Sequence, residues 1–157
     1  MRIALFEPEI AGNVGAMLWL AACLGADVDL IEPMGFEWND KRVRRTAMDY
    51  IDHVVVARHA GFEAFRASIG SRRLVLFTTK SRQSAYDFSF MADDVLLFGK
   101  ESAGVPPGVA AACDAQVRVP MRPQVRSMNV ATTAALALGE ALRQTATLPS
   151  KGPRGIV

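Results

Sequence analysis

Residues 95–106 read VLLFGKESAGVP, and this stretch gives the clearest indication of the fold of the 157-residue chain. Its first four residues are apolar without interruption, which is typical of a strand buried on both faces of a parallel sheet. Other apolar runs of similar length occur along the chain. Strands are predicted at Arg2–Phe6, Asp27–Ile31, His53–Ala57, Leu74–Thr78, Val95–Phe98 and Gln116–Val119.

Helical patterns separate these runs. Helices are predicted at Val14–Leu24, Asp40–Met48 (a short basic helix or ordered loop), Ala60–Ile69, Pro106–Ala112 and Ser127–Thr145. The first is apolar nearly all round and should be buried, and Ser127 is a candidate N-cap for the last. Alternating strands and helices predict an α/β fold, a parallel sheet with helices on both faces. We expect one domain over residues 1–148 and a disordered tail over residues 149–157.

Composition excludes several classes of protein. Half of the residues are hydrophobic and 22% are charged, which is unlike a disordered chain. No apolar run approaches the ~18 residues of a membrane span, and the N-terminus lacks a secretion signal. A soluble cytoplasmic protein without a membrane partner is therefore expected. Cys23 and Cys113 are predicted to be buried thiols, and no spacing of Cys or His predicts a metal site.

Positive charge is concentrated in two places. Residues 41–45 read KRVRR, and Arg118, Arg122 and Arg126 recur every four residues within a stretch, Ala115–Gly139, that contains no acid. Two acid-free basic patches favour an anionic partner such as a nucleic acid, although net charge is only +2.

The segments after the fourth, fifth and sixth predicted strands are the candidate ligand site. Ligands of parallel sheets bind beyond the carboxyl ends of the strands. The first turn matches the dinucleotide fingerprint poorly and the phosphate-loop pattern is absent. The later loops, Thr79–Lys80, Gly99–Pro106 and Pro120–Asn129, are rich in glycine or proline and would expose backbone groups to a nucleoside-like ligand. Phe77, Val119, Met121 and Met128 would supply apolar walls.

Four motifs resemble the SPOUT superfamily of knotted RNA methyltransferases, and within it the TrmL-like (YibK) group. They are EPEIAGNVG at 7–15, IEPMGFEWNDKRVRR at 31–45, FGKESAGVP at 98–106 and VPMRPQVRSMN at 119–129. The resemblance covers about residues 2–144. It implies a trefoil knot near the C-terminus, a homodimer, and S-adenosylmethionine bound in the knot without a metal. The small residues of the last predicted helix would also allow close contact with a second subunit.

The resemblance also implies site residues and a reaction. The reaction is methylation of the ribose 2′-hydroxyl of wobble nucleotide 34, cytidine or 5-carboxymethylaminomethyluridine, in leucine tRNAs. Asn13 and Asn129 match polar positions near the transferred methyl group. Cofactor contacts are expected from Phe77, Thr78, Gly99, Glu101, Gly104, Val119, Met121, Ser127 and Met128. The tRNA backbone is expected to lie on Lys41, Arg42, Arg45, Arg122 and Arg126.

Two positions depart from the family pattern. Trp19 stands where many relatives carry an arginine thought to help activate the hydroxyl, and Gly139 stands where relatives often carry a tyrosine. With no histidine in the loops, the proton acceptor stays open among an RNA phosphate, a water held by Asn13 or Asn129, and Arg126. Alternative functions are methylation of another tRNA or rRNA site, a non-catalytic RNA-binding module, and a flavodoxin-like or Rossmann-like small-molecule enzyme.

Overall fold

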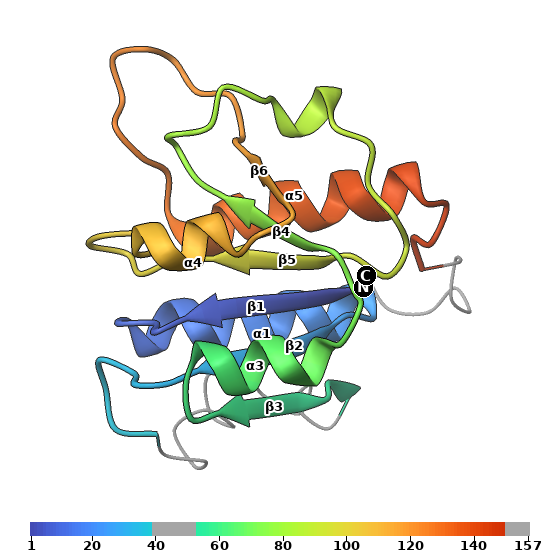
Figure 1. Ribbon diagram of the computed structural model, residues 1–157. Coiled ribbons are helices and arrows are strands. Elements are labelled where there is room, and N and C mark those ends of the chain that lie inside the picture. The colour runs from blue at the N-terminus through green and yellow to red at the C-terminus, as the bar shows by residue number, and fades with distance from the viewer. Residues whose placement is uncertain (39–52, 150–157) are drawn as a thin grey trace.

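The computed structural model describes residues 1–38 and 53–149 (Figure 1). In this part of the chain, strands alternate with the helices that connect them. The predicted helix at Asp40–Met48 and residues 150–157 lie outside the described residues. The elements in chain order are β1 (Arg2–Phe6), α1 (Ala11–Leu24), β2 (Asp27–Ile31), β3 (Val56–His59), α3 (Phe62–Ile69), β4 (Leu74–Phe77), the 3-10 helix η2 (Ala85–Asp87), β5 (Val95–Phe98), α4 (Pro107–Ala111), β6 (Ala115–Val117) and α5 (Val130–Gln144).

The strands form one six-stranded sheet in the order β3-β2-β1-β5-β4-β6. Every pairing is parallel, and β1 lies between β2 and β5. All residues of β4 and β5 are buried, as their uninterrupted apolar character predicts for strands covered on both sides. The predicted α/β fold with a parallel sheet is confirmed.

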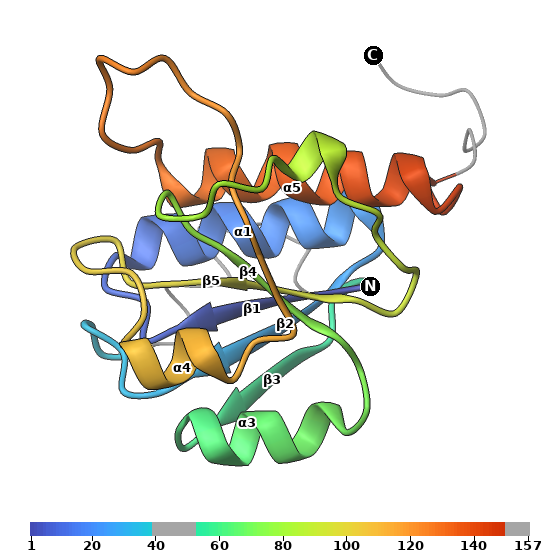
Figure 2. The same ribbon diagram turned by 45° about the horizontal axis from the view of Figure 1, so that its top comes forward.

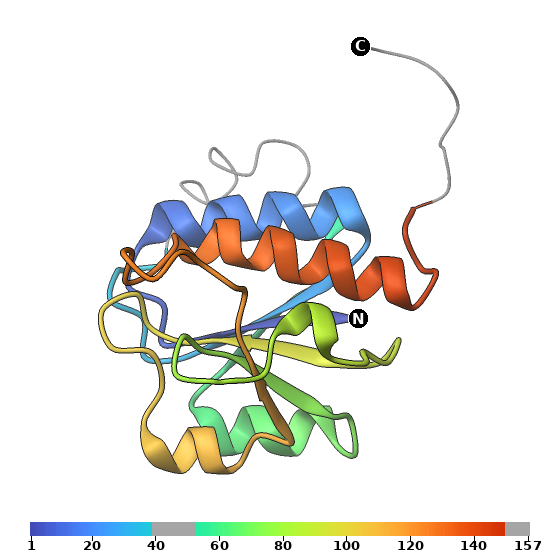
Figure 3. The ribbon, with the colours of Figure 1, turned by 90° about the horizontal axis from the view of Figure 1, so that it is seen from above.

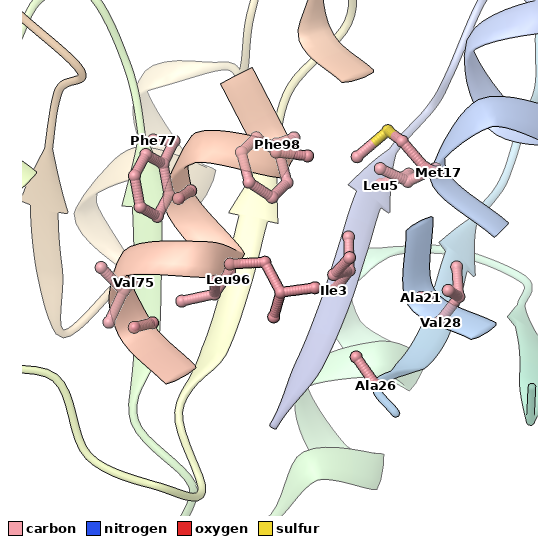
Figure 4. Close-up of a cluster of buried hydrophobic side chains, with 14 of the residues drawn as sticks. Ile3, Leu5, Met17, Ala21, Ala26, Val28, Val75, Phe77, Leu96 and Phe98 are labelled. Atoms are coloured by element: carbon pink, nitrogen blue, oxygen red, sulfur yellow. The ribbon is translucent and has the colours of Figure 1, made fainter. Parts of the chain in front are cut away.

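Helices cover both faces of this sheet. The helices α1 and α5 lie side by side on one face, and α3 and α4 lie on the other (Figures 2 and 3). Ile3 and Leu5 of β1 point toward α1 and α5, where they join Leu96, Phe98 and Met17 in the larger buried cluster (Figure 4). Alternate residues of β1 belong to a second cluster with α3. The period-two alternation of side chains thus builds a core on each side of the sheet.

Helix α1 is buried on one side only, which corrects the prediction of a fully buried helix. Met17, Leu18 and Ala21 are buried, whereas Trp19 is 44% exposed and Cys23 is exposed. The predicted burial of Cys23 is therefore wrong, and Cys113 is half-buried. In residues 1–38 and 53–149, no helix is long and apolar enough to cross a lipid bilayer.

Several element boundaries differ by a few residues from the predictions, and two of these differences change side-chain contacts. The third strand begins at Val56, three residues later than predicted, and extends to His59. This register places the His59 ring nitrogen Nε2 2.8 Å from the buried Asp29 carboxylate of β2. The last helix begins at Val130, and its N-cap is Asn129 rather than Ser127, because Asn129 Oδ1 accepts hydrogen bonds from the backbone of Ala131 and Thr132.

The end of α5 holds the β4–β5 connection in place. Gln144 Nε2 donates to the carbonyl of Phe88 at 3.0 Å, and Gln144 Oε1 accepts from the backbone N–H of Phe90 at 3.0 Å. Gln144 also donates to Glu140, whose carboxylate accepts two hydrogen bonds from Arg143. These bonds join the last helix to a segment more than fifty residues earlier in the chain.

A pH dependence of stability follows from Glu140. The hydrogen bonds from Arg143 and then Gln144 lower the pKa of Glu140 from 4.5 to about 2. A depressed folded-state pKa stabilises the fold above the unfolded pKa, and this contribution is lost as pH falls toward 2. In urea unfolding, the stability difference between the unaltered protein and Glu140→Gln should shrink between pH 4.5 and about 2. A difference independent of pH in this range would contradict the assignment.

Candidate functional site

A cleft of about 710 Å³ opens at the carboxyl ends of β4, β5 and β6. The loop after β5 and residues 118–129 after β6 meet there with the first turns of α1 and α5, at the left of Figure 1. Every residue predicted to bind cofactor lines this cleft, as do Asn13 and Asn129. The residues come together because the ends of parallel strands share one edge of the sheet.

The loop at residues 99–104 is the tightest part of the cleft. Lys100 and Gly104 exchange two backbone hydrogen bonds of 2.9 Å. A Cβ at Gly99 would meet the carbonyl carbon of Gly104 at 2.5 Å, so only glycine fits. Gly104 has φ of 70°, a conformation that glycine adopts without strain. The loop therefore needs both of its glycines.

Residues 7–9, between β1 and α1, brace this loop. Lys100 Nζ forms an ion pair with Glu7, which raises the pKa of Lys100. The Glu9 carboxylate accepts hydrogen bonds from Ser102 Oγ at 2.8 Å and from its backbone N–H at 2.9 Å, which lower the pKa of Glu9. The loop is thus fixed by side chains that lie more than ninety residues away in the sequence.

A chain of hydrogen bonds joins three polar residues of the cleft. Glu101 Oε2 accepts from the backbone N–H of Glu9 at 2.8 Å, and Glu101 Oε1 accepts from Asn13 Nδ2 at 2.9 Å. Asn13 Oδ1 in turn accepts from Asn129 Nδ2 at 2.9 Å. Each amide keeps one further N–H, because an amide nitrogen carries two donors. The arrangement can present fixed donors to an oxygen atom of a ligand.

The predicted substrate residues are only partly described. Arg122 and Arg126 are exposed in the 118–129 loop and do not line the cleft. Lys41, Arg42 and Arg45 lie outside the described residues. Three cations that were not assigned from the sequence, Lys80, Lys100 and Arg118, line the cleft. The sequence contained indications of a role for two of them, since Lys80 follows a predicted strand and Arg118 begins the run of arginines spaced by four.

The chemistry of the cleft fits a nucleoside sulfonium such as S-adenosylmethionine. Phe77 and Val119 give it nearly buried apolar walls, and its glycine loop brings backbone polar groups to the surface. Its volume lies within the range of small-molecule sites. Within residues 1–38 and 53–149, no three His, Cys, Asp or Glu residues are grouped so that they could hold a metal ion.

Trp19, the first of the two departures from the expected family pattern, does not line this cleft. It is 44% exposed and is not among the described residues that line the cleft. The described part of the cleft contains no histidine.

The chain is similar to known methyltransferases, which agrees with a cleft that fits S-adenosylmethionine. The SpoU rRNA methylase family pattern matches residues 1–139. A tRNA (cytidine(34)-2′-O)-methyltransferase of Beijerinckia indica is 53% identical over 148 residues, covering 93% of this chain and 92% of that protein.

The fold of this chain is also similar to solved structures of RNA methyltransferases. A structure described as giving insight into 2-OH methylation of C/U34 on tRNA has a TM-score of 0.86 and 36% identity, covering 91% of this chain and 94% of that one. The SpoU methyltransferase AviRb of Streptomyces viridochromogenes, in complex with AdoMet, has a TM-score of 0.77 and 27% identity. The match covers 92% of this chain and 57% of that one.

Proposed function

This chain belongs to the SpoU rRNA methylase family, and we propose that it methylates the ribose 2′-hydroxyl of nucleotide 34 of tRNA with S-adenosylmethionine as methyl donor. The observation that carries the proposal is the cleft at the ends of β4, β5 and β6, in a chain 53% identical to an enzyme named for this reaction. The substrates are cytidine 34 and 5-carboxymethylaminomethyluridine 34 of leucine tRNAs, in the cytoplasm.

The cofactor is held by the residues that line the cleft on the strand side. Phe77, Thr78, Val119, Met121 and Met128 enclose it, while Gly99, Gly104 and Ser127 contribute backbone contacts. Both carboxylate oxygens of Glu101 accept N–H groups of the chain, which holds the side chain toward Glu9 and Asn13, and we assign its cofactor contact to the main chain. When bound, S-adenosylmethionine supplies an electrophilic methyl group, and no metal is required.

The polar chain of Glu101, Asn13 and Asn129 positions the ribose hydroxyl. Neither amide can accept a proton at neutral pH, so both act as donors to the substrate oxygen. Glu101 fixes the orientation of the Asn13 amide, and Asn13 fixes that of Asn129. Holding a weak nucleophile in line with the bond that breaks can contribute several kcal/mol, about 7–11 in well-oriented cases. The tRNA backbone lies on Arg122 and Arg126 together with Lys41, Arg42 and Arg45.

The reaction is tested with labelled S-adenosylmethionine and total tRNA, followed by mapping of the methylated nucleotide by mass spectrometry. We expect a 2′-O-methyl group at position 34 of leucine tRNAs. Methylation only at another position of tRNA, or in rRNA, would show that nucleotide 34 is not the target. Binding of RNA without methylation would support the non-catalytic alternative.

The outward faces of α1 and α5 form the contact of a homodimer. Along α1 this face contains Ala16, Trp19 and Cys23, and along α5 it contains Ala135 and Leu136, all of them exposed. The helices α1 and α5 lie side by side (Figure 3), so we expect these residues to form one apolar surface of mostly small side chains. Small residues allow two helix layers to approach closely, and a second copy of the chain offers a matching surface.

The substitution Ala135→Glu should break this dimer. A charge buried without a partner at the centre of an apolar interface is strongly unfavourable. Light scattering should give twice the chain mass of 17.0 kDa for the unaltered protein and 17.0 kDa for the variant. Ala64→Glu on α3, an exposed alanine on the other face of the sheet, is the control and should leave the dimer intact. An unaltered protein of 17.0 kDa would reject the interface.

We infer that the C-terminal segment forms the trefoil knot of the SPOUT fold. The inference is supported by the path of the chain: β6 lies at the sheet edge beside β4, and α5 returns to pack on α1 and β5. The side chain of Gln144, at the end of α5, also forms hydrogen bonds with the β4–β5 connection. In the proposed knot, the C-terminal segment threads past this connection.

A further inference from the structure

A group of cations at the rim of the cleft has no role in the reaction described above. Lys80, Arg82 and Arg118 are exposed, and we refer to them as the cationic rim. Lys80 and Arg118 line the cleft, while Arg82, two residues after Lys80, is not among the described residues that line it. None of the three side chains has a hydrogen bond or ion pair with any residue in the described part of the chain.

The backbone brings these three residues together although they are distant in the sequence. Arg118 donates its N–H to the carbonyl of Gln83 at 2.9 Å and accepts from the N–H of Ala85 at 2.8 Å. Ser81 Oγ donates to the carbonyl of Gln116 at 2.8 Å. Residues 78–85 therefore run beside β6 and its extension, and they carry Lys80 and Arg82 along with Arg118.

Several other cations of the described part are neutralised by neighbouring carboxylates. Arg2 pairs with Asp29, Arg73 with Asp94 and Lys100 with Glu7. Unpaired cations that lie close together repel one another and therefore do not stabilise the fold. Such a group at one edge of a cleft indicates a binding surface for an anionic ligand.

We propose that the cationic rim binds phosphate groups of the tRNA strand that flanks the target nucleotide, which extends the RNA-binding surface across the strand-side edge of the cleft. The assignment rests on the proposed function. Three cations suit a polyanion better than the cofactor, because S-adenosylmethionine carries a single carboxylate. Arg82 also lies outside the cleft, where a bound RNA strand could reach it and an enclosed cofactor could not.

The test is binding of a fluorescent anticodon stem-loop of a leucine tRNA in saturating adenosylhomocysteine, so that no reaction is needed. In the combined variant Lys80→Gln, Arg82→Gln and Arg118→Gln, affinity should fall about 10- to 100-fold. Between about 50 and about 200 mM salt, the slope of log affinity against log salt should fall by about 2, or about 0.7 for each lost phosphate contact. Arg72→Gln is the matched control, because Arg72 is exposed and lies just before β4, at the opposite end of the sheet.

Three results would decide the matter. Loss of RNA affinity and salt slope, with adenosylhomocysteine binding unchanged, supports the proposal. Unchanged RNA affinity, or a fall in adenosylhomocysteine affinity with an unchanged salt slope, overturns it. Arg82→Gln alone gives a second measurement if the combined variant does not fold. If the unaltered protein binds the stem-loop but methylates no RNA, the proposed reaction fails while the variants still decide the role of the rim.

Discussion

The variant Gly99→Ala is expected to lose cofactor affinity by about 10- to 100-fold. The added Cβ would lie 2.5 Å from the carbonyl carbon and 2.7 Å from the Cα of Gly104, both of which are backbone atoms that no rotamer change can move. The loop must then open, and the two Lys100–Gly104 hydrogen bonds would be strained or broken. Overpacking of this kind costs about 1–3 kcal/mol, and about 1.4 kcal/mol corresponds to a tenfold change in affinity.

Calorimetry with adenosylhomocysteine measures this effect, and thermal unfolding reports the accompanying loss of stability. Gly108→Ala is the matched control, since a Cβ at Gly108 in α4 would meet no atom within 4 Å. The control should bind as the unaltered protein does. Normal binding by Gly99→Ala would mean that the loop does not shape the cofactor site.

The variant Glu101→Gln is expected to lower the rate of methyl transfer by about 100-fold while cofactor affinity changes little. Its amide nitrogen would face either the Asn13 side-chain donor or the Glu9 N–H, so one of the two hydrogen bonds would be lost. Loss of the bond to Asn13 would free the Asn13 amide, and loss of the bond to Glu9 would loosen the side chain that orients this amide. Misplacement of a positioning group by about 1 Å can cost about 100-fold in rate.

Single-turnover kinetics at saturating cofactor and tRNA measure this rate. The double variant Glu101→Gln with Asn13→Ala should be scarcely slower than Asn13→Ala alone, because the two residues act as one unit. Glu63→Gln, an exposed change on α3, is the control. A large loss of cofactor affinity with an unchanged rate would instead make the Glu101 carboxylate a direct cofactor ligand.

Much of this architecture could be predicted from the sequence because its signals are local. Uninterrupted apolar runs such as Leu74–Phe77 and Val95–Phe98 predict buried parallel strands, and the ends of such strands converge on one edge. That convergence is why residues as distant as Phe77, Gly99 and Val119 could be placed around one cleft.

The parts that were not predicted depend on contacts between distant residues. Ser127 and Asn129 are both acceptable N-caps, and local preference does not choose between them. Asn129 is the cap, and its amide also bonds to Asn13, which lies 116 residues away. The bracing of Ser102 by Glu9 is similarly invisible in either segment alone. For α1, a helix that is apolar all round does not reveal that its Trp19 side faces outward.

The position of β1 at the middle of the sheet has a consequence for how the chain acquires its shape during synthesis. One edge of β1 pairs with β2, which the ribosome delivers soon afterwards, but the other waits for β5, more than ninety residues later. Until then the nascent chain exposes an unpaired apolar strand edge, a known hazard for aggregation. Such a late long-range pairing also predicts slow folding. The cleft at the carboxyl ends of β4, β5 and β6, lined mostly by segments after residue 76, is then among the last parts of the chain to be completed.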